Sequence, residues 1–291
     1  MTFVLPAFGM GVVSSPTAPP GAFNITTRDT EANIITTTPT NPAGEVNVAF
    51  GTDTYALYIY DGSAWNIYNE DPFNTYSVDL DGTNDYVAVG ASSDFSFGTS
   101  DFSFSAWFYP DVVSGFRPVI DFRQSSGNLL PSLYYSTTSG YRLYLWTGSS
   151  QVANYNTTLT AGQWYHVVYT RSGTAGTIYL NGTSVATGTD SSNYSLNGQP
   201  HIGGKAPGVT ASYHDGPIDE VSVFNSALSA SDVSDMYNSG VPTDISSLSP
   251  VAWWRMGDND SGTGTTVTDQ GSGGNDGTLT NGATFSTTVP S

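Results

Sequence analysis

Hydrophobic and polar residues alternate along several short segments of the chain, and this pattern predicts β-strands. In FSFSAWFYP (102–110), one face carries Phe102, Phe104, Ala106 and Phe108, and the opposite face carries Ser103, Ser105, Trp107 and Tyr109. Residues 164–169 alternate in the same way. One face of each strand can therefore join a core while the other is polar and aromatic, as a sandwich of two sheets requires.

Turn and cap residues predict where other elements begin and end. Asn181-Gly182 separates TIYL from TSVA, and this dipeptide tolerates positive φ at both positions of a two-residue hairpin turn. Residues 218–224 predict a strand, and one short helix follows it. Ser229 can cap the N-terminus of this helix, and Asp232 in its first turn can complete a capping box by accepting a hydrogen bond from the Ser229 backbone N–H. Gly240 is expected to end the helix.

The first 75 residues have a different character. Residues 1–44 show no periodic pattern and are interrupted by proline and glycine, which predicts an extended N-terminal arm. Two interpretations stay open: a flexible terminus, or an arm that becomes ordered on a partner through the apolar anchors Phe3, Val4, Leu5 and Phe8. Residues 45–74 predict a small antiparallel meander of three short strands, which has too little core to be stable alone.

Composition excludes several classes of protein. The 291 residues include no cysteine, so no disulfide framework holds the fold. No run of 18 apolar residues occurs, so we expect no membrane-spanning helix. Seven Lys and Arg residues face 25 Asp and Glu residues, and the net charge of −18 repels the phosphates of nucleic acids. We therefore expect neither a membrane nor a nucleic acid as partner.

Four spaced motifs resemble the laminin-G-like domains, which are jelly rolls of the concanavalin A type. They are SVDLDGTNDYVAVG (77–90), FSFSAWFYP (102–110), GQWYHVVYTRSGTAGTIYLNGTSVATG (162–188) and GPIDEVSVFNSALSASDVSDMY (216–237). The resemblance covers residues 75–240 and implies an all-β fold, a two-sheet antiparallel jelly-roll sandwich. Residues 241–291 resemble the segment that usually precedes the first motif. They are either a truncated second repeat or strands that complete a sheet, and we favour a C-terminal β extension packed on the same chain's jelly roll.

Residues 45–69, EVNVAFGTDTYALYIYDGSAWNIYN, resemble short units found in bacteriophage virion proteins. This resemblance implies a structural protein of the virion surface, either a capsid decoration protein or part of a tail fibre. Its arm would attach to other capsid or tail proteins, and three copies would form a homo-oligomer. The alternative is a secreted or cell-surface bacterial carbohydrate-binding module, which would be extracellular.

Carbohydrate binding is the commonest activity that the laminin-G resemblance implies, and one aromatic stretch suits it. Residues 132–156 supply the candidates Tyr135, Tyr141, Arg142, Tyr144, Trp146 and Tyr155. Alternation puts Tyr144 and Trp146 on one face, opposite Leu143 and Leu145. If the leucines are core, the aromatic rings are available to a host or environmental polysaccharide. The alternative is that the rings are ordinary sandwich packing.

Two acidic motifs are candidates for calcium, since this hard cation prefers carboxylate and loop carbonyl oxygens. Asp81 and Asp85 lie in DLDGTNDYV, and Asp219 lies in DGPIDEV. The resemblance implies that the two motifs lie close together and that calcium binds there. The alternative is that Asp81 only makes a turn and that Asp219 is a buried hydrogen-bond acceptor.

The sequence gives little support to an enzyme. The Glu-x-Asp-x-x-Glu pattern of jelly-roll glucanases is absent, and of four glutamates only Glu220 lies in the predicted sandwich. The three histidines, His166, His201 and His214, lack the spacing of metal ligands, and His166 is expected to be a packed strand residue. We therefore expect no catalytic activity, with a polysaccharide hydrolase as the least favoured alternative.

Overall fold

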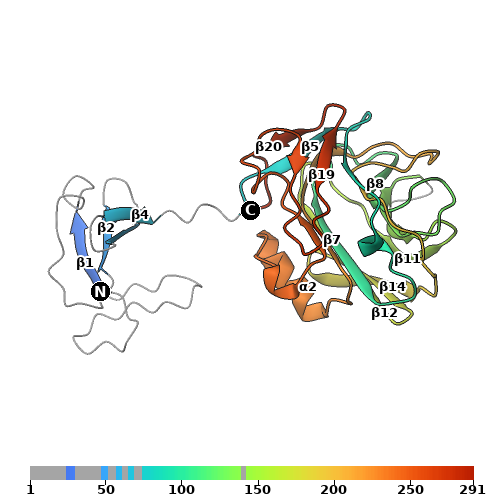
Figure 1. Ribbon diagram of the computed structural model, residues 1–291, viewed down its shortest axis with the longest axis horizontal. Coiled ribbons are helices and arrows are strands. Elements are labelled where there is room, and N and C mark those ends of the chain that lie inside the picture. Colours follow the sequence, from blue (N-terminus) through green and yellow to red (C-terminus); the bar gives the residue numbers. More distant parts are fainter. Residues whose placement is uncertain (1–23, 30–46, 52–56, 61–64, 69–73, 139–141) are drawn as a thin grey trace. The chain divides into compact units, whose positions relative to one another are not determined.

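The computed structural model describes residues 24–29, 47–51, 57–60, 65–68, 74–138 and 142–291. The chain forms two compact units, Met1–Pro72 and Phe73–Ser291, drawn in Figure 1. The described residues contain no helix that is long and apolar enough to cross a membrane.

The N-terminal unit contains a four-stranded sheet in the order β1-β2-β3-β4. Its strands are β1 (Asn24–Asp29), β2 (Asn47–Gly51), β3 (Leu57–Tyr60) and β4 (Trp65–Tyr68). The last three pair antiparallel, as the sequence predicts, whereas β1 pairs parallel with β2. The prediction of an arm without regular structure is therefore wrong for β1. Its sequence NITTRD is β-branched but has a single apolar residue, so it gives no alternation to detect. The anchors Phe3, Val4, Leu5 and Phe8 lie outside the described residues.

The C-terminal unit is a sandwich of two eight-stranded sheets, which confirms the predicted all-β jelly roll. The front sheet has the order β11-β10-β9-β8-β15-β6-β19-β18, and the back sheet has the order β14-β13-β12-β7-β16-β5-β20 with β17 paired to β16. The strands of the front sheet are β6 (Tyr86–Val89), β8 (Phe116–Asp121), β9 (Ser132–Ser136), β10 (Arg142–Trp146), β11 (Gln151–Asn156), β15 (His201–Ile202), β18 (Thr266–Val267) and β19 (Gly277–Thr280). Those of the back sheet are β5 (Ser77–Asp81), β7 (Phe102–Phe108), β12 (Tyr165–Ser172), β13 (Ala175–Leu180), β14 (Thr183–Thr189), β16 (Asp215–Phe224), β17 (Ala252–Trp254) and β20 (Thr284–Ser286).

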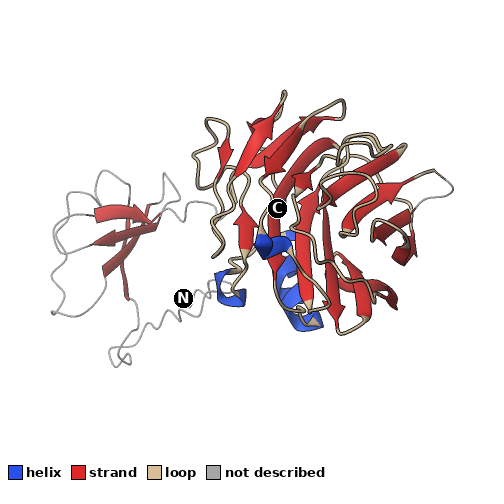
Figure 2. Ribbon diagram, turned by 45° about the vertical axis from the view of Figure 1, so that its right-hand side comes forward, coloured by secondary structure: helices blue, strands red, loops and turns tan. Residues whose placement is uncertain are grey.

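The main core lies between the two sheets and is built from the alternating faces of their strands, whose layers Figure 2 shows in red. Phe102, Phe104 and Phe108 of β7 point into it and are fully buried. Val167 and Tyr169 of β12 lie on the same side. The hairpin between β13 and β14 turns at Asn181 and Gly182, both with positive φ, as predicted.

The outer face of the back sheet is also buried, because helix α2 (Ala230–Tyr237) and the segment after it cover it. A second hydrophobic cluster fills this layer and consists of Val168, Tyr179, Phe224, Leu228, Val233, Met236, Ile245 and Trp253. Most of the polar face predicted for residues 102–109 therefore does not meet solvent: Ser103, Ser105 and Trp107 are buried there, and Tyr109 is half-buried. His166, as predicted, is a packed strand residue that bonds Ser105 Oγ through Nε2 at 2.8 Å. Burial lowers its pKa to about 3.

The cap of α2 is a capping box, as the sequence predicts. Ser229 Oγ accepts from Asp232 N at 3.2 Å, and Asp232 Oδ2 accepts from Ser229 N at 2.8 Å. The end of the helix differs from the prediction. Asn238, not Gly240, is the C-cap, because an asparagine tolerates its left-handed conformation (φ 40°). Three short 3₁₀ turns complete the helical elements described here: η1 (Ser93–Phe95), η2 (Asn238–Gly240) and η3 (Ser246–Leu248).

The Ser229→Ala change removes an acceptor for the first turn of α2 and should lower the free energy of unfolding by about 1 kcal/mol. Ser231→Ala is the matched control, since Ser231 is exposed one residue inside the helix and should leave stability within about 0.5 kcal/mol. Urea unfolding of the two variants measures the difference. Equal midpoints would show that the cap contributes nothing.

The last 51 residues belong to the sandwich. β19 pairs with β6 in the front sheet, and β20 pairs with β5 in the back sheet. β17 pairs with β16 and places Trp254 in the core, where its ring centroid lies 6.1 Å from that of Phe95. Residues 241–291 thus add strands to both sheets of their own chain.

Candidate functional site

The outer face of β10 presents the aromatic residues that the alternation predicts. Leu143 and Leu145 are fully buried in the main core. Arg142, Tyr144 and Trp146 therefore point to the opposite, outer face of the front sheet. The rings on this face are available to a ligand only where nothing covers them.

An aromatic cluster forms where three neighbouring strands meet on this face. Tyr144 of β10 lies opposite Tyr134 of β9, with ring centroids 5.9 Å apart. Phe116 of β8 lies 4.5 Å from Tyr134 and 6.2 Å from Tyr144, and the latter pair is stacked. These contacts hold the rings in fixed orientations, so the surface they make is preformed.

A groove with a volume of about 300 Å³ opens over this cluster. That volume is at the lower end of the range of small-ligand sites, which is about 300–1,000 Å³. The lining residues are Phe116, Arg123, Ser126, Tyr144, Trp146, Gln151, Gly208, Val209 and Thr210. They come from strands β8, β10 and β11, the segment after β8 and the loop 203–214.

Several hydrogen bonds hold the loop 203–214 against β8 and the segment that follows it. Ser126 N donates to Pro207 O at 2.9 Å, and Ser212 N donates to Phe116 O at 2.9 Å. Ala206 N donates to Asp121 Oδ2 at 3.1 Å. The loop can therefore serve as a fixed wall of the groove, facing the aromatic wall made by Tyr144 and Trp146.

A buried ion pair supports the groove from below. Arg123 donates from Nε and Nη2 to the two carboxylate oxygens of Asp121, each at 2.8 Å. The same carboxylate accepts from the hydroxyls of Ser132 at 2.6 Å and Tyr134 at 2.8 Å. Burial opposes its ionisation, but the hydrogen bond and charge of Arg123, with the other donors, outweigh burial and lower the pKa of Asp121. The carboxylate is thus ionised and fully engaged, and it fixes Arg123 in the groove.

Arg142 lies beside the groove. Its guanidinium carbon is 5.4 Å from the ring centroid of Tyr144, and its Nη1 donates to Gln151 Oε1 at 3.4 Å. Nη2 donates to Thr138 O at 3.2 Å. Arg142 is therefore next to two lining residues, Tyr144 and Gln151.

Three of the six predicted carbohydrate-binding residues come together here, namely Arg142, Tyr144 and Trp146. Tyr135 does not: it packs in the main core, and its hydroxyl bonds His214 Nδ1 at 3.1 Å. Tyr155 pairs with Leu143 and so shares the core-side face of the sheet. Tyr135 is buried and Tyr155 does not line the groove, so neither residue joins this site, and Tyr141 lies outside the described residues.

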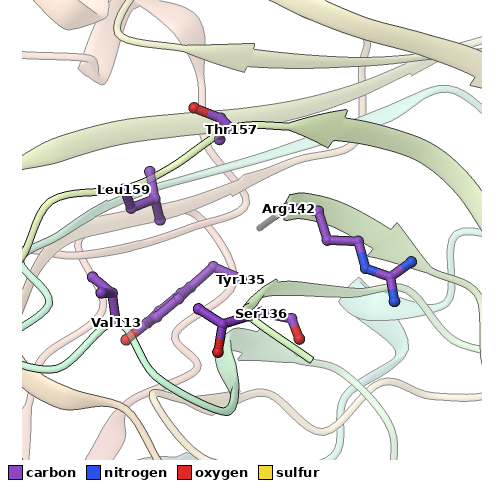
Figure 3. Close-up of a pocket in the computed structure, with 7 residues that line it drawn as sticks. Val113, Tyr135, Ser136, Arg142, Thr157 and Leu159 are labelled. Atoms are coloured by element: carbon purple, nitrogen blue, oxygen red, sulfur yellow. The ribbon is translucent and has the colours of Figure 1, made fainter. Parts of the chain in front are cut away.

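A second hollow lies beside Tyr135 and is shown in Figure 3. Its volume is about 10 Å³, which suits at most one water molecule. It is lined by Val113, Tyr135, Ser136, Thr137, Arg142, Thr157 and Leu159. The guanidinium of Arg142 points away from Val113 and Leu159 in Figure 3. This hollow is too small for a sugar, and Arg142 is directed elsewhere.

The predicted calcium ligands do not converge. Asp81 Oδ1 accepts from Thr83 N at 2.8 Å, which is a local turn. Asp85 Oδ1 accepts from Gly282 N at 2.7 Å. Asp219 is fully buried and accepts from Asn74 Nδ2 at 2.8 Å and from Glu220 N at 2.7 Å. The described residues contain no group of three or more His, Cys, Asp or Glu side chains that could hold a metal ion. Calcium binding stays a prediction.

Sequence reasoning missed Phe116, Arg123, Gln151 and the loop wall Gly208–Thr210. Phe116 begins β8 and Arg123 follows its end, and the register of this strand shifts between Pro118 and Ile120, so simple alternation misplaces its faces. The loop 203–214 has no periodicity at all. One signal was available in the sequence: residues 122–214, which include all of these residues except Phe116, contain a single acidic residue, Asp190.

The described residues form a jelly-roll domain with a ligand-sized aromatic groove on its front sheet. Residues 81–234 match the Laminin_G_3 family, described as the concanavalin A-like lectin/glucanases superfamily. The match covers more than half of the chain, and the protein belongs to this family. No curated protein sequence matches the chain.

Solved structures share the fold at low sequence identity. A protein from Bacteroides ovatus ATCC 8483, for which carbohydrate binding has been inferred, is 18% identical with a TM-score of 0.56, over 86% of this chain and 71% of that chain. A native heptameric SAP-like pentraxin from Limulus polyphemus is 18% identical (TM-score 0.43), over 56% of this chain and 82% of that chain. Domain 4 of AbnA, a GH43 extracellular arabinanase from Geobacillus stearothermophilus in complex with arabinotriose, is 19% identical (TM-score 0.44), over 68% and 84%.

Proposed function

We propose that this protein is a non-catalytic carbohydrate-binding protein and that the groove over β8, β10 and β11 is its binding site. One observation carries the proposal. Tyr144 and Trp146 form an aromatic wall in a groove of about 300 Å³ whose lining also offers hydroxyl, amide and guanidinium groups. A sugar presents apolar C–H faces to aromatic rings and hydroxyls to polar groups, so the lining matches both of its surfaces.

The groove supports binding rather than hydrolysis. Retaining glycoside hydrolysis needs two carboxyl groups about 5 Å apart at the bond that is cleaved, and inverting hydrolysis also needs two. None of the described lining residues is Asp or Glu. The nearest carboxylate along the chain, Asp121, is held by Arg123 and three further donors. It therefore has no role left as an acid or a nucleophile.

The virion role expected from residues 45–69 stays a prediction, as do its trimer, its capsid or tail partners and its place on a virion surface. The groove instead agrees with the alternative expectation of a carbohydrate-binding module. A binding domain of this kind is compatible with either setting, since weak sites gain avidity when many copies are displayed together.

The test is a glycan array with the full chain, followed by titration of the best glycan into Trp146→Ala. Loss of a central aromatic anchor costs about 2 kcal/mol, so affinity should fall about 30-fold. Trp164→Ala is the matched control, because Trp164 is half-buried, contacts Tyr109 and does not line the groove. Unchanged affinity of the Trp146 variant, or no binding of any glycan by the folded protein, would refute the proposal.

A further inference from the structure

Acidic residues are distributed very unevenly along this chain. Of its 25 Asp and Glu residues, only Asp190 falls between residues 122 and 214. The same stretch carries four of the seven cationic residues, namely Arg123, Arg142, Arg171 and Lys205. A chain with a net charge of −18 therefore contains one long segment that is locally cationic.

This segment builds the groove. Every lining residue except Phe116 belongs to it. Its single acidic residue, Asp190, is buried and accepts from the hydroxyls of Tyr169 at 2.8 Å and Tyr194 at 3.0 Å. Asp190 also pairs with Arg171, at 3.8 Å. The carboxylates of Asp121 and Asp190 are thus engaged, and the groove lining itself contains no Asp or Glu.

Arg142 lies beside the groove, and its positive charge is paired with no carboxylate among the described residues. Its partners are a carbonyl and an amide, Thr138 O and Gln151 Oε1, which are neutral and lie at 3.2 and 3.4 Å. Its Nε is buried and has no hydrogen-bond partner among the described residues. The four ion pairs between described residues do not include Arg142. A charge-assisted hydrogen bond to an incoming anion would use Nη1 and Nη2, whose bonds to neutral acceptors are long.

The local charge, rather than the net charge, decides what the groove attracts. At physiological ionic strength the Debye length is about 8 Å, so charges farther than this from a ligand in the groove are largely screened. The binding of a neutral sugar does not depend on whether acidic residues surround the groove. An anionic sugar, in contrast, would be repelled if acidic residues lay around the groove.

We propose that the ligand of the groove is an acidic saccharide, whose carboxylate or sulfate pairs with Arg142 while its ring stacks on Trp146 and Tyr144. This inference rests on the proposed function and names the class of sugar. Arg123 is committed to Asp121 and keeps the floor of the groove in place, whereas Arg142 recognises the anion.

The experiment compares matched polysaccharides by isothermal titration of the full chain. A uronate polymer is paired with its carboxyl-reduced form, and a sulfated polymer with its desulfated form. We expect one acidic polymer to bind about tenfold more tightly than its neutral counterpart, and raising the salt from 50 to 500 mM to weaken only the acidic one. The arm that shows the preference identifies the anion.

Arg142→Gln should remove this preference, lowering affinity for the acidic polymer about tenfold and leaving affinity for the neutral form unchanged. Lys205→Gln is the control, since Lys205 lies over the ring of Tyr213 and does not line the groove. Equal binding of acidic and neutral forms, or no effect of Arg142→Gln, would overturn the inference while Trp146-dependent binding still upheld the proposed function. Absence of all glycan binding would defeat both.

Discussion

A chain truncated after Gly240 should not form the sandwich at all, although residues 75–240 contain the whole laminin-G resemblance. The missing segment supplies Trp254, which is fully buried, and Met256 and Val267, also fully buried in the main core. It also supplies Ile245 and Trp253 to the cluster beneath α2. Without β19 and β20, both β6 and β5 lose a pairing partner.

The expected size of this effect follows from one residue of the segment. Trp254→Ala alone should lower the free energy of unfolding by about 3–5 kcal/mol, because the cavity left by a buried tryptophan does not close. A domain of this size has a total stability of about 5–15 kcal/mol. Loss of several such side chains together therefore exceeds what the remaining domain can supply.

Denaturant unfolding followed by tryptophan fluorescence measures both changes. We expect no cooperative transition for the truncated chain and a lowered midpoint for Trp254→Ala. Trp254→Phe is the control, because it keeps a ring against Phe95 and loses only part of the indole volume and the hydrogen bond from Nε1 to Asn275 O, which is 2.8 Å long. The idea fails if the truncated chain unfolds cooperatively at the midpoint of the intact protein.

Replacement of Arg255 by methionine should be the second severe change, and its effect should depend on pH. Arg255 Nε donates to Glu220 Oε1 at 3.1 Å, and Trp253 Nε1 donates to the other oxygen at 2.6 Å. Glu220 is 5% exposed and lies next to the fully buried Asp219. Burial raises the pKa of Glu220 to about 7, although Arg255 and Trp253 oppose this rise. Burial and the neighbouring Glu220 charge raise the pKa of Asp219 as well.

The sign of the pH dependence follows from that raised pKa. Glu220 holds its proton more tightly in the folded protein than in the unfolded chain, where its pKa is near 4.5. Its protonation therefore stabilises the fold below about pH 4.5, and this contribution is lost as pH rises through about 7. Without Arg255, the folded-state pKa rises further and the loss continues to higher pH. We expect Arg255→Met to cost about 3–5 kcal/mol at pH 8 and clearly less at pH 5.

Urea unfolding at pH 5 and pH 8 checks this prediction. At each pH the free energy of unfolding of Arg255→Met is subtracted from that of the parent protein. The difference is needed because burial lowers the pKa of His166 and of His214 to about 3, which favours the fold at higher pH in both proteins. Glu220→Gln combined with Arg255→Met is the control, since it removes the buried charge that Arg255 compensates. Two results would contradict the idea that Arg255 compensates the buried charge of Glu220. One is an equal loss of unfolding free energy at pH 5 and pH 8, and the other is a double variant as unstable as Arg255→Met at pH 8.

The sequence predicted the elements that have one apolar and one polar face. It did not predict the orientation of side chains in strands whose two faces are both buried. β7, β12, the hairpin at Asn181-Gly182 and the capped helix all carry a strong local signal, and all are present. In β9 every residue is buried, so alternation could not tell that Tyr134 packs on Phe116 and Tyr144 on the outer side of the sheet and that Tyr135 joins the main core. β10 was placed correctly because its leucines alternate with larger polar-tipped side chains.

The remaining parts of the site depend on tertiary structure. The pairing of Arg123 with Asp121 and the position of the loop 203–214 are set by hydrogen bonds between residues distant in sequence, such as Ala206 and Asp121. Likewise, Asp219 sits in a motif that suggested a metal, whereas the fold gives it Asn74 and Glu220 N as donors. A motif identifies the residue types, and burial decides what they do.

The pairing of β20 with β5 has a consequence for how this sandwich can be connected to other proteins. Ser77, near the start of the Phe73–Ser291 unit, pairs with Ser286, near its end. The chain thus enters and leaves on adjacent strands of the back sheet, while the groove lies on the front sheet. Such a module can be spliced into a surface loop of a host protein or circularly permuted, with its binding face kept clear of both junctions.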